Sequence, residues 1–219
     1  MRVSGIILAG GLSSRMGTDK ALLPLGEGNV IQVIVSELSK AVDVVSIAVG
    51  KGYREEFAEL GHVQAVDLYP ECGPLAGLHA GLTANRGARP SGAGGWSLSV
   101  PCDTPLVRSE LFKALIKYAE QQENSCCQAI VPVIEGQTHP LIAMYQDSVI
   151  PILEQQLEAG KRRVMDILSQ ISVRYITEHE LSVNAGLPWT APRVSEMFVN
   201  MNQKEDYERI KKRYGLKGI

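Results

Sequence analysis

Residues 3–20, VSGIILAGGLSSRMGTDK, join a short apolar run to a glycine-rich polar loop, and this pairing decides the fold. The run Val3–Leu8 has the composition of a strand that is covered on both faces, as the strands of parallel sheets are. The adjacent glycines Gly10 and Gly11 let the backbone approach a ligand and direct successive N–H groups at an anion. We therefore expect a loop up to about Lys20 that binds a ligand directly after the first strand.

The charges of this loop favour a phosphate-rich ligand. Arg15 and Lys20 place two cations within a few residues of the glycines, which suits a triphosphate whose charge must be neutralised before its phosphorus can be attacked. The loop fits neither the G-x-x-x-x-G-K-[ST] pattern nor G-x-G-x-x-G. The alternative is an ordinary turn with solvated side chains, and the combined spacing of Arg15, Gly17, Asp19 and Lys20 makes that alternative the weaker one.

Strand-like and helix-like segments alternate through the rest of the first half. Such alternation predicts βαβ units and a mostly parallel sheet. Asn29 and Ser109 are expected to cap two of the helices, and 85–95, with four glycines and a proline, is expected to be a flexible surface loop. The expected strands are 44–49, 63–67 and 96–100, and the expected helices are 29–41, 53–60, 75–84 and 109–121.

The second half has a different pattern. Residues 129–134 and 141–145, joined through a turn at 135–137, predict an antiparallel hairpin, and 173–177 predicts a further strand. A helix over 148–158 should end at Gly160, and a capping box of Asn202 and Glu205 should open a last helix over 204–214. The whole pattern predicts a single three-layer, Rossmann-like α/β domain over 1–219, with halves 1–108 and 109–219.

Composition excludes several classes of protein. The 22 lysines and arginines against 24 acidic residues give a net charge of −2, which argues against binding nucleic acid through bulk charge. The apolar runs are far shorter than the ~20 residues that a membrane span needs, and we expect neither a membrane segment nor a signal peptide. The four cysteines form no C-x-x-C pair, so a cytoplasmic protein is expected, without disulfides or zinc.

Two aspartates stand where expected strands end. Asp103, in V-P-C-D-T-P, follows 96–100, and the carboxyl edge of a parallel sheet is where ligands bind. A carboxylate there can hold Mg²⁺ together with substrate phosphates, and the neighbouring phosphate loop favours this interpretation over a turn-capping aspartate. Asp67 stands at the end of 63–67 in the same way and could accept hydrogen bonds from a nucleobase or ribose, although a solvated loop aspartate stays an equal alternative.

These motifs together resemble one enzyme family. L-A-G-G-x₃-R-M-G-x-D-K, G-P-L-A-G at 73–77 and C-D-T-P at 102–105 resemble the molybdenum cofactor guanylyltransferases, the MobA family of nucleotidyltransferases. The first motifs alone would mark only the wider superfamily, which includes sugar-phosphate and cytidylyl enzymes. The later segments A-G-K-R-R-V-M at 159–165 and F-V-N-M-N at 198–202 favour the MobA family. The resemblance implies the nucleotidyltransferase fold from residue 6 to about 210.

The resemblance also assigns roles to residues. In the nucleotide-binding half, 1–108, Lys20 and Arg15 would contact the GTP phosphates, Asp67 the nucleoside, and Asp103 would hold Mg²⁺. The backbone contacts to the nucleotide would come from Leu8, Ala9, Gly10 and Gly11. In the acceptor half, 109–219, the pterin substrate would be received by His139, Arg162, Arg163, Asn200 and Asn202.

The implied reaction transfers GMP from GTP to molybdenum-carrying molybdopterin and releases pyrophosphate. It needs no protein nucleophile, because the acceptor phosphate itself attacks, and the chain has no Ser-His-Asp pattern. Arg15, Lys20 and Asp103 would act as the catalytic groups. Other cofactor-biosynthesis proteins and apo-molybdoenzymes are the implied protein partners.

Alternatives stay open. Gly50 stands where the family often has an asparagine near the base, so cytidylyl transfer to the same pterin is an alternative. Transfer to a sugar phosphate is another. A non-enzymatic adaptor that delivers the cofactor is a third, although Arg15, Lys20 and Asp103 argue against it because a carrier needs no metal-held leaving group.

Overall fold

A computed structural model of the protein describes residues 1–11, 18–90, 95–122, 125–184 and 191–216. Within these residues one sheet of eight strands has the order β10-β7-β9-β6-β1-β4-β5, with β8 paired to β7, and β2 and β3 form a separate small hairpin. The strands are β1 Val3–Leu8, β2 Pro24–Leu25, β3 Gly28–Asn29, β4 Val44–Gly50, β5 Val63–Val66, β6 Trp96–Pro101, β7 Ala129–Ile134, β8 Gln137–Thr138, β9 Ala143–Gln146 and β10 Val173–Thr177.

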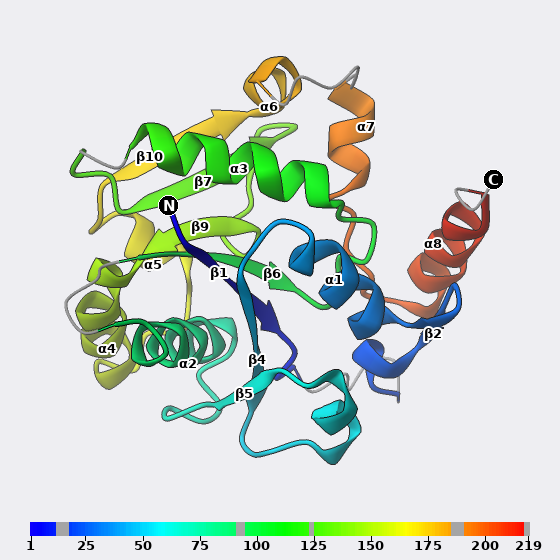
Figure 1. The fold of residues 1–219 in the computed structure, drawn as a ribbon, viewed down its shortest axis with the longest axis horizontal. Coiled ribbons are helices and arrows are strands. Elements are labelled where there is room, and N and C mark those ends of the chain that lie inside the picture. The colour runs from blue at the N-terminus through cyan, green and yellow to red at the C-terminus, as the bar shows by residue number, and fades with distance from the viewer. Residues whose placement is uncertain (12–17, 91–94, 123–124, 185–190, 217–219) are drawn as a thin grey trace.

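Helices cover both faces of the large sheet, which makes three layers (Figure 1). One apolar core lies between the sheet and α1, α3, α6, α7 and α8, and a second lies between the opposite face and α2, α4 and α5. The α-helices are α1 Val30–Ser39, α2 Pro74–Gly87, α3 Ser109–Gln121, α4 Ile150–Glu158, α5 Met165–Leu168, α6 Glu178–Asn184, α7 Ala191–Glu196 and α8 Lys204–Leu216. The 3₁₀ helices are η1 Lys20–Leu22, η2 Glu55–Leu60 and η3 Asp147–Val149.

The strand directions confirm a mostly parallel sheet with an antiparallel part in the second half. β1 runs parallel to β4 and β6, β4 to β5, and β7 to β10, whereas β9 is antiparallel to both β6 and β7. The hairpin from β7 to β8 turns at Glu135 and Gly136, with φ of 50° and 75°. Two positive φ angles are what a two-residue hairpin loop of type I′ requires.

Two segments differ from the expectation. The predicted helix at 53–60 is the 3₁₀ helix η2, which begins only at Glu55. The predicted loop at 85–95 does not begin at Asn85, because α2 continues to Gly87 and Asn85 is buried, donating to Gly5 O (3.3 Å) and Ser97 Oγ (3.2 Å). Residues 91–94 of that loop lie outside the described residues.

The expected caps are also partly wrong. Asn29 caps α1 in a full capping box with Gln32, as predicted. Ser109, however, is the first residue of α3, and its N–H donates to the carboxylate of Glu37 on α1, at 2.7 Å. At α8 the backbone N–H groups of residues 202 and 203 donate to Asp206, and the predicted partner Glu205 has no part in the cap.

The cap that Glu37 supplies to α3 predicts a stability that depends on pH. Burial raises the pKa of the Glu37 carboxyl, but hydrogen bonds from Lys40 and Ser109 outweigh this effect and hold the pKa below its ordinary value. The ionised carboxylate therefore stabilises the fold above the unfolded pKa, and this stability is lost as the pH falls through the folded pKa. We expect Glu37→Gln to lower the free energy of unfolding at pH 7 by about 1–2 kcal/mol.

Urea unfolding at several pH values tests this expectation. The difference between wild type and Glu37→Gln should shrink below pH ~4.5, where the wild-type carboxylate becomes protonated. Glu120, an exposed carboxylate on α3, the helix that Glu37 caps, provides the matched control. Glu120→Gln should change the unfolding free energy by less than about 0.5 kcal/mol. If the difference in unfolding free energy between wild type and Glu37→Gln does not change with pH, the ionised carboxylate is not what stabilises the start of α3.

Candidate active site

Backbone hydrogen bonds extend the sheet beyond its strand ends and align the candidate residues. The N–H of Ala9 donates to β4 at 2.8 Å, that of Asp67 to the last residue of β4 at 2.8 Å, and that of Cys102 to the last residue of β1 at 3.1 Å. The strand ends therefore follow one another along the carboxyl edge in the order β6, β1, β4 and β5. Asp103 follows Cys102 on this edge, as the sequence predicted.

The end of the chain returns to the same edge. Lys20 Nζ donates to Oδ1 of Asn202 at 3.2 Å, across 182 positions of sequence. The N–H of Met201 donates to the backbone carbonyl of Asp103 at 2.7 Å. The structure thus brings together three of the predicted residues, Lys20, Asp103 and Asn202. Arg15, the fourth loop candidate, lies outside the described residues.

Groups of opposite charge lie near the half-buried Cys102. Burial raises the pKa of the Asp103 carboxyl, and the charge of Lys20 opposes that rise. Burial, with the negative charges of Asp103 and Asp19, raises the pKa of the Cys102 thiol to about 12, so this thiol is not a nucleophile at neutral pH. A carboxylate that is poorly solvated gains from a nearby cation, and Asp103 therefore suits either a metal ion or a cationic group.

The structure describes no complete metal site. Among the described residues no group of three or more His, Cys, Asp or Glu side chains could hold a metal ion. A metal at Asp103 would thus be held by few protein ligands and would need oxygens from a substrate. This donor set fits Mg²⁺, which is usually bound by one or two carboxylates plus substrate phosphates.

Asp67 is half-buried and lies close to the buried His79. Within the described residues, Oδ1 of Asp67 and Nδ1 of His79 are buried without hydrogen-bond partners. Burial raises the pKa of the Asp67 carboxyl, and His79 opposes that rise. Nε2 of His79 lies 3.3 Å from Glu154, and its ring meets the Tyr69 ring edge-on at 5.4 Å. An unpaired buried carboxylate oxygen is costly, so a ligand donor would be favoured there.

The remaining acceptor-side candidates are distributed along the same half of the chain. His139 is half-buried, its ring lies 4.7 Å from that of Phe198, and burial lowers its pKa. Asn200, Arg162 and Arg163 are exposed. The His139–Phe198 contact brings the hairpin to the F-V-N-M-N segment.

The charge of Arg162 acts on a group at the donor side of the edge. The hydrogen bond from Lys51 at 2.7 Å lowers the pKa of the exposed Glu71 carboxyl, and the charge of Arg162 adds to this effect. Lys51 follows β4 and Glu71 follows β5, so Arg162 acts on groups that stand beyond the ends of two donor-side strands. The described structure gives no comparable contact for the Arg163 side chain.

The sequence did not indicate Arg54. Its guanidinium forms an ion pair with Asp19 and contacts the carbonyl of Ala9 at 3.5 Å, so it touches the loop at both ends. In sequence it belongs to Y-R-E-E, which is typical of an exposed helix start. No local signal could have found it, because its partners lie 35 and 45 residues away.

Gly10 and Gly50 bring two strand ends into backbone contact. A Cβ on Gly10 would lie 2.7 Å from the backbone nitrogen of Gly50, and Gly50 itself has a φ of +81°. Gly10→Ala should therefore destabilise the fold by about 1–3 kcal/mol through overpacking. Gly11→Ala is the matched control, because a Cβ there meets nothing within 4 Å among the described residues. Thermal unfolding of the two variants tests this, and equal melting midpoints would contradict the close approach.

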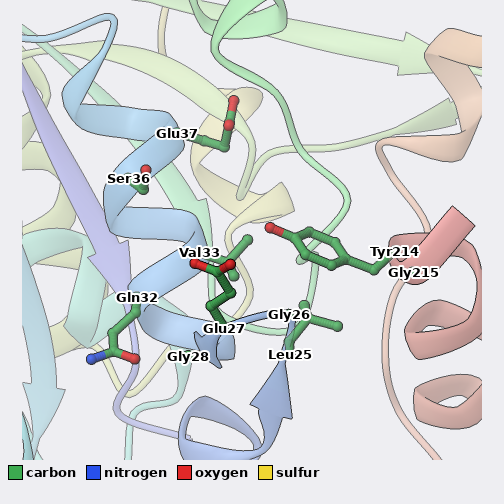
Figure 2. Close-up of a pocket in the computed structure, with 10 residues that line it drawn as sticks. All are labelled: Leu25, Gly26, Glu27, Gly28, Gln32, Val33, Ser36, Glu37, Tyr214 and Gly215. Carbon is green, nitrogen blue, oxygen red and sulfur yellow. The ribbon is translucent and has the colours of Figure 1, made fainter. Parts of the chain in front are cut away.

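A pocket of about 450 Å³ lies elsewhere, between the β2–β3 hairpin, α1 and the end of α8 (Figure 2). Its walls include the carboxylates Glu27 and Glu37, with the Tyr214 ring beside them. Two acidic side chains disfavour a triphosphate, and Glu37 already caps α3. This pocket therefore does not suit a nucleoside triphosphate.

No helix in the described part of the chain is both long and apolar enough to cross a membrane.

Known proteins resemble this chain over nearly its full length. A "probable molybdenum cofactor guanylyltransferase" of Bacillus cereus (strain G9842) is 32% identical over 214 residues, 96% of each chain, and one of Bacillus mycoides (strain KBAB4) has the same identity and coverage. The crystal structure of molybdopterin-guanine dinucleotide biosynthesis protein A from Archaeoglobus fulgidus matches with a TM-score of 0.75 and 23% identity, over 97% of this chain and 99% of that one. It confirms the three-layer nucleotidyltransferase fold. The MobA-like NTP transferase domain matches residues 5–175. The chain is therefore a nucleotidyltransferase and belongs to the family of MobA-like NTP transferases.

Proposed function

We propose that the protein transfers GMP from GTP to the terminal phosphate of molybdenum-carrying molybdopterin, releasing pyrophosphate and forming a molybdopterin guanine dinucleotide. The observation that carries the proposal is the meeting of Lys20, Asp103 and Asn202 at the carboxyl edge of the sheet. The donor-side and acceptor-side motifs are thereby neighbours. The names of the two Bacillus relatives, both probable molybdenum cofactor guanylyltransferases, support the choice of substrates.

The donor half, 1–108, would bind GTP along the strand ends. The backbone of Leu8–Gly11 would approach the nucleotide, and its N–H groups with Lys20 would offset the charge of the phosphates. Asp67, whose buried Oδ1 has no partner within the described residues, would accept a hydrogen bond from the nucleoside. Arg15 would add a second cation from the same loop.

Asp103 would hold a divalent ion, which we propose to be Mg²⁺. The fit rests on the carboxylate's partial burial and on the small number of protein ligands near it. Such an ion would supply positive charge to the donor phosphates and so ease departure of pyrophosphate. The chain's own task is to keep this carboxylate ionised, and the charge of Lys20 does so by opposing the rise of its pKa.

The acceptor half, 109–219, would place the pterin phosphate for in-line attack on the α-phosphorus. Asn202 contacts Lys20 directly, and Arg162 is exposed beside Glu71, so both could reach a substrate that approaches the bound nucleotide. His139, Arg163 and Asn200 would complete the acceptor site. Because the acceptor supplies its own nucleophile, catalysis would consist of positioning and charge stabilisation.

The four free cysteines support a cytoplasmic location.

A pyrophosphate-release assay tests the proposal. The purified protein is incubated with Mg²⁺ and GTP, CTP or ATP in turn, with either purified molybdenum-carrying molybdopterin or a sugar phosphate as the acceptor, and the product is identified by mass spectrometry. We expect GTP to be preferred. A preference for CTP, or turnover only with sugar phosphates, would replace guanylyl transfer by one of the two enzymatic alternatives. Nucleotide binding without pyrophosphate release would favour the cofactor-delivery adaptor.

A further inference from the structure

Arg54 connects the two ends of the phosphate loop. Its guanidinium pairs with the carboxylate of Asp19 at the end of the loop, and Nη1 contacts the carbonyl of Ala9 at its start, at 3.5 Å. The side chain is 19% exposed and that of Asp19 is 27% exposed, so the pair is less screened than a surface salt bridge. A planar guanidinium can donate to two acceptors at once and holds them in a fixed relative direction. The ammonium of lysine imposes no such fixed geometry.

Arg54 is itself held in place from two sides. Its guanidinium lies over the ring of the fully buried Phe57, 4.0 Å from the ring centre. Its backbone N–H donates to Oε1 of Gln64 at 2.8 Å, and its carbonyl accepts from Nε2 of the same side chain at 2.9 Å. Arg54 is thus held by contacts with the core and with β5, and its position can fix that of the residues it contacts, Ala9 and Asp19.

Each contact orients a group that we assign to the nucleotide phosphates. In a planar trans peptide the C=O and the following N–H point in opposite directions, so a carbonyl of Ala9 directed at Arg54 turns the N–H of Gly10 away from it. At the other end, Oδ1 of Asp19 accepts from the N–H of Ala21 at 2.9 Å and caps the 3₁₀ helix η1. Lys20 is the first residue of that helix.

We infer that Arg54 is a positioning residue for the donor phosphates, which fixes the direction of Gly10 N–H and the backbone from which Lys20 projects. The inference rests on the proposed function, in which Lys20 binds the phosphates. Arg54 need not touch the substrate. Its effect on nucleotide binding acts through Lys20 and the loop backbone, and the contribution of Arg54 should therefore depend on the presence of the Lys20 ammonium.

A double-mutant cycle measures this dependence. The affinity for GTP, and for inorganic tripolyphosphate as a probe without a base, is measured by calorimetry for wild type, Arg54→Gln, Lys20→Gln and the double variant. We expect Arg54→Gln to weaken binding about tenfold in the wild-type background and less than about twofold in the Lys20→Gln background. Arg54→Lys should restore only part of the loss. Arg86→Gln, an exposed arginine in the last turn of α2, is the matched control and should bind as wild type does.

The outcomes distinguish the phosphate-binding role of Lys20 from the positioning role of Arg54. If Lys20→Gln binds as tightly as wild type, the assignment of the phosphates to Lys20 is wrong, and this inference fails with it. If Lys20→Gln binds weakly but Arg54→Gln costs the same in both backgrounds, the positioning role alone is overturned. Should Arg54→Gln lower the melting midpoint too far for binding measurements, Asp19→Asn carries the cycle instead, because asparagine keeps an oxygen for the Ala21 cap while losing the charge that pairs with Arg54.

Discussion

Asp103→Asn is expected to lower kcat by about 10²–10⁴-fold, the range seen when a strong electrostatic contact to a transition state is lost. The same substitution should leave the melting midpoint unchanged or slightly raised. The reason is that burial raises the pKa of this carboxyl, so the ionised group is held at a cost that a neutral amide avoids. The contact with the F-V-N-M-N segment survives, because Met201 donates to the backbone carbonyl of Asp103 and not to its side chain.

Pyrophosphate release and thermal unfolding, measured on the same preparations, test this pairing of effects. If Asp103 holds the metal, the Mg²⁺ concentration for half-maximal activity should also rise in Asp103→Asn. Glu120→Gln, a carboxylate exposed on α3, controls for the loss of one negative charge and should leave both readouts unchanged. Wild-type turnover in Asp103→Asn would remove this residue from the catalytic groups.

The residues at the sheet edge were predictable because a parallel sheet gives sequence patterns a spatial meaning. Each buried parallel run ends at the same edge, so polar residues directly after such runs line that edge. Asp67 and Asp103 follow this rule, as does the glycine pair after β1. Sequence position alone was sufficient here, since the hydrogen-bond ladder continues one residue beyond each strand.

The rest of the site depends on contacts between distant segments, and single-sequence patterns do not encode them. The Lys20–Asn202 hydrogen bond and the Arg54–Asp19 ion pair join residues 182 and 35 positions apart. The cap of α3 comes from Glu37, which lies on another helix. A local pattern favours Ser109 as the cap because serine is a good capping residue, yet the neighbouring helix supplies a charged acceptor instead.

The segment 85–95 shows how composition can mislead. Its glycines and proline predicted a flexible surface loop, but Arg89 within it is only 10% exposed. Nη1 of Arg89 lies 2.5 Å from both carboxylate oxygens of Asp147, and Nη2 donates to the Trp96 carbonyl at 2.9 Å and to Ser4 and Ser97 hydroxyls at 3.1 Å each. This arginine connects the segment after α2 to β1, β6 and the 3₁₀ helix η3. The described part of the segment is therefore a structural connection.

Arg89→Met is expected to lower the free energy of unfolding by about 3–5 kcal/mol, because it leaves the Asp147 carboxylate buried without its cation. Asp147 is 8% exposed, so water cannot replace the lost partner without local opening. Chemical denaturation at pH 7 measures the change. Arg86→Met, at an exposed position in the last turn of α2, should stay within about 0.5 kcal/mol of wild type.

The double variant Arg89→Met/Asp147→Leu distinguishes a costly unpaired charge from lost packing. Replacing both members of a buried ion pair by apolar groups is often neutral, whereas removing one member is strongly destabilising. The double variant should therefore recover much of the stability that Arg89→Met loses. Some deficit should persist, since the Trp96 carbonyl and the hydroxyls of Ser4 and Ser97 would also lose the donor that Arg89 supplies. An Arg89→Met variant with an unfolding free energy within about 1 kcal/mol of wild type would show that the segment after α2 packs against η3 without this ion pair.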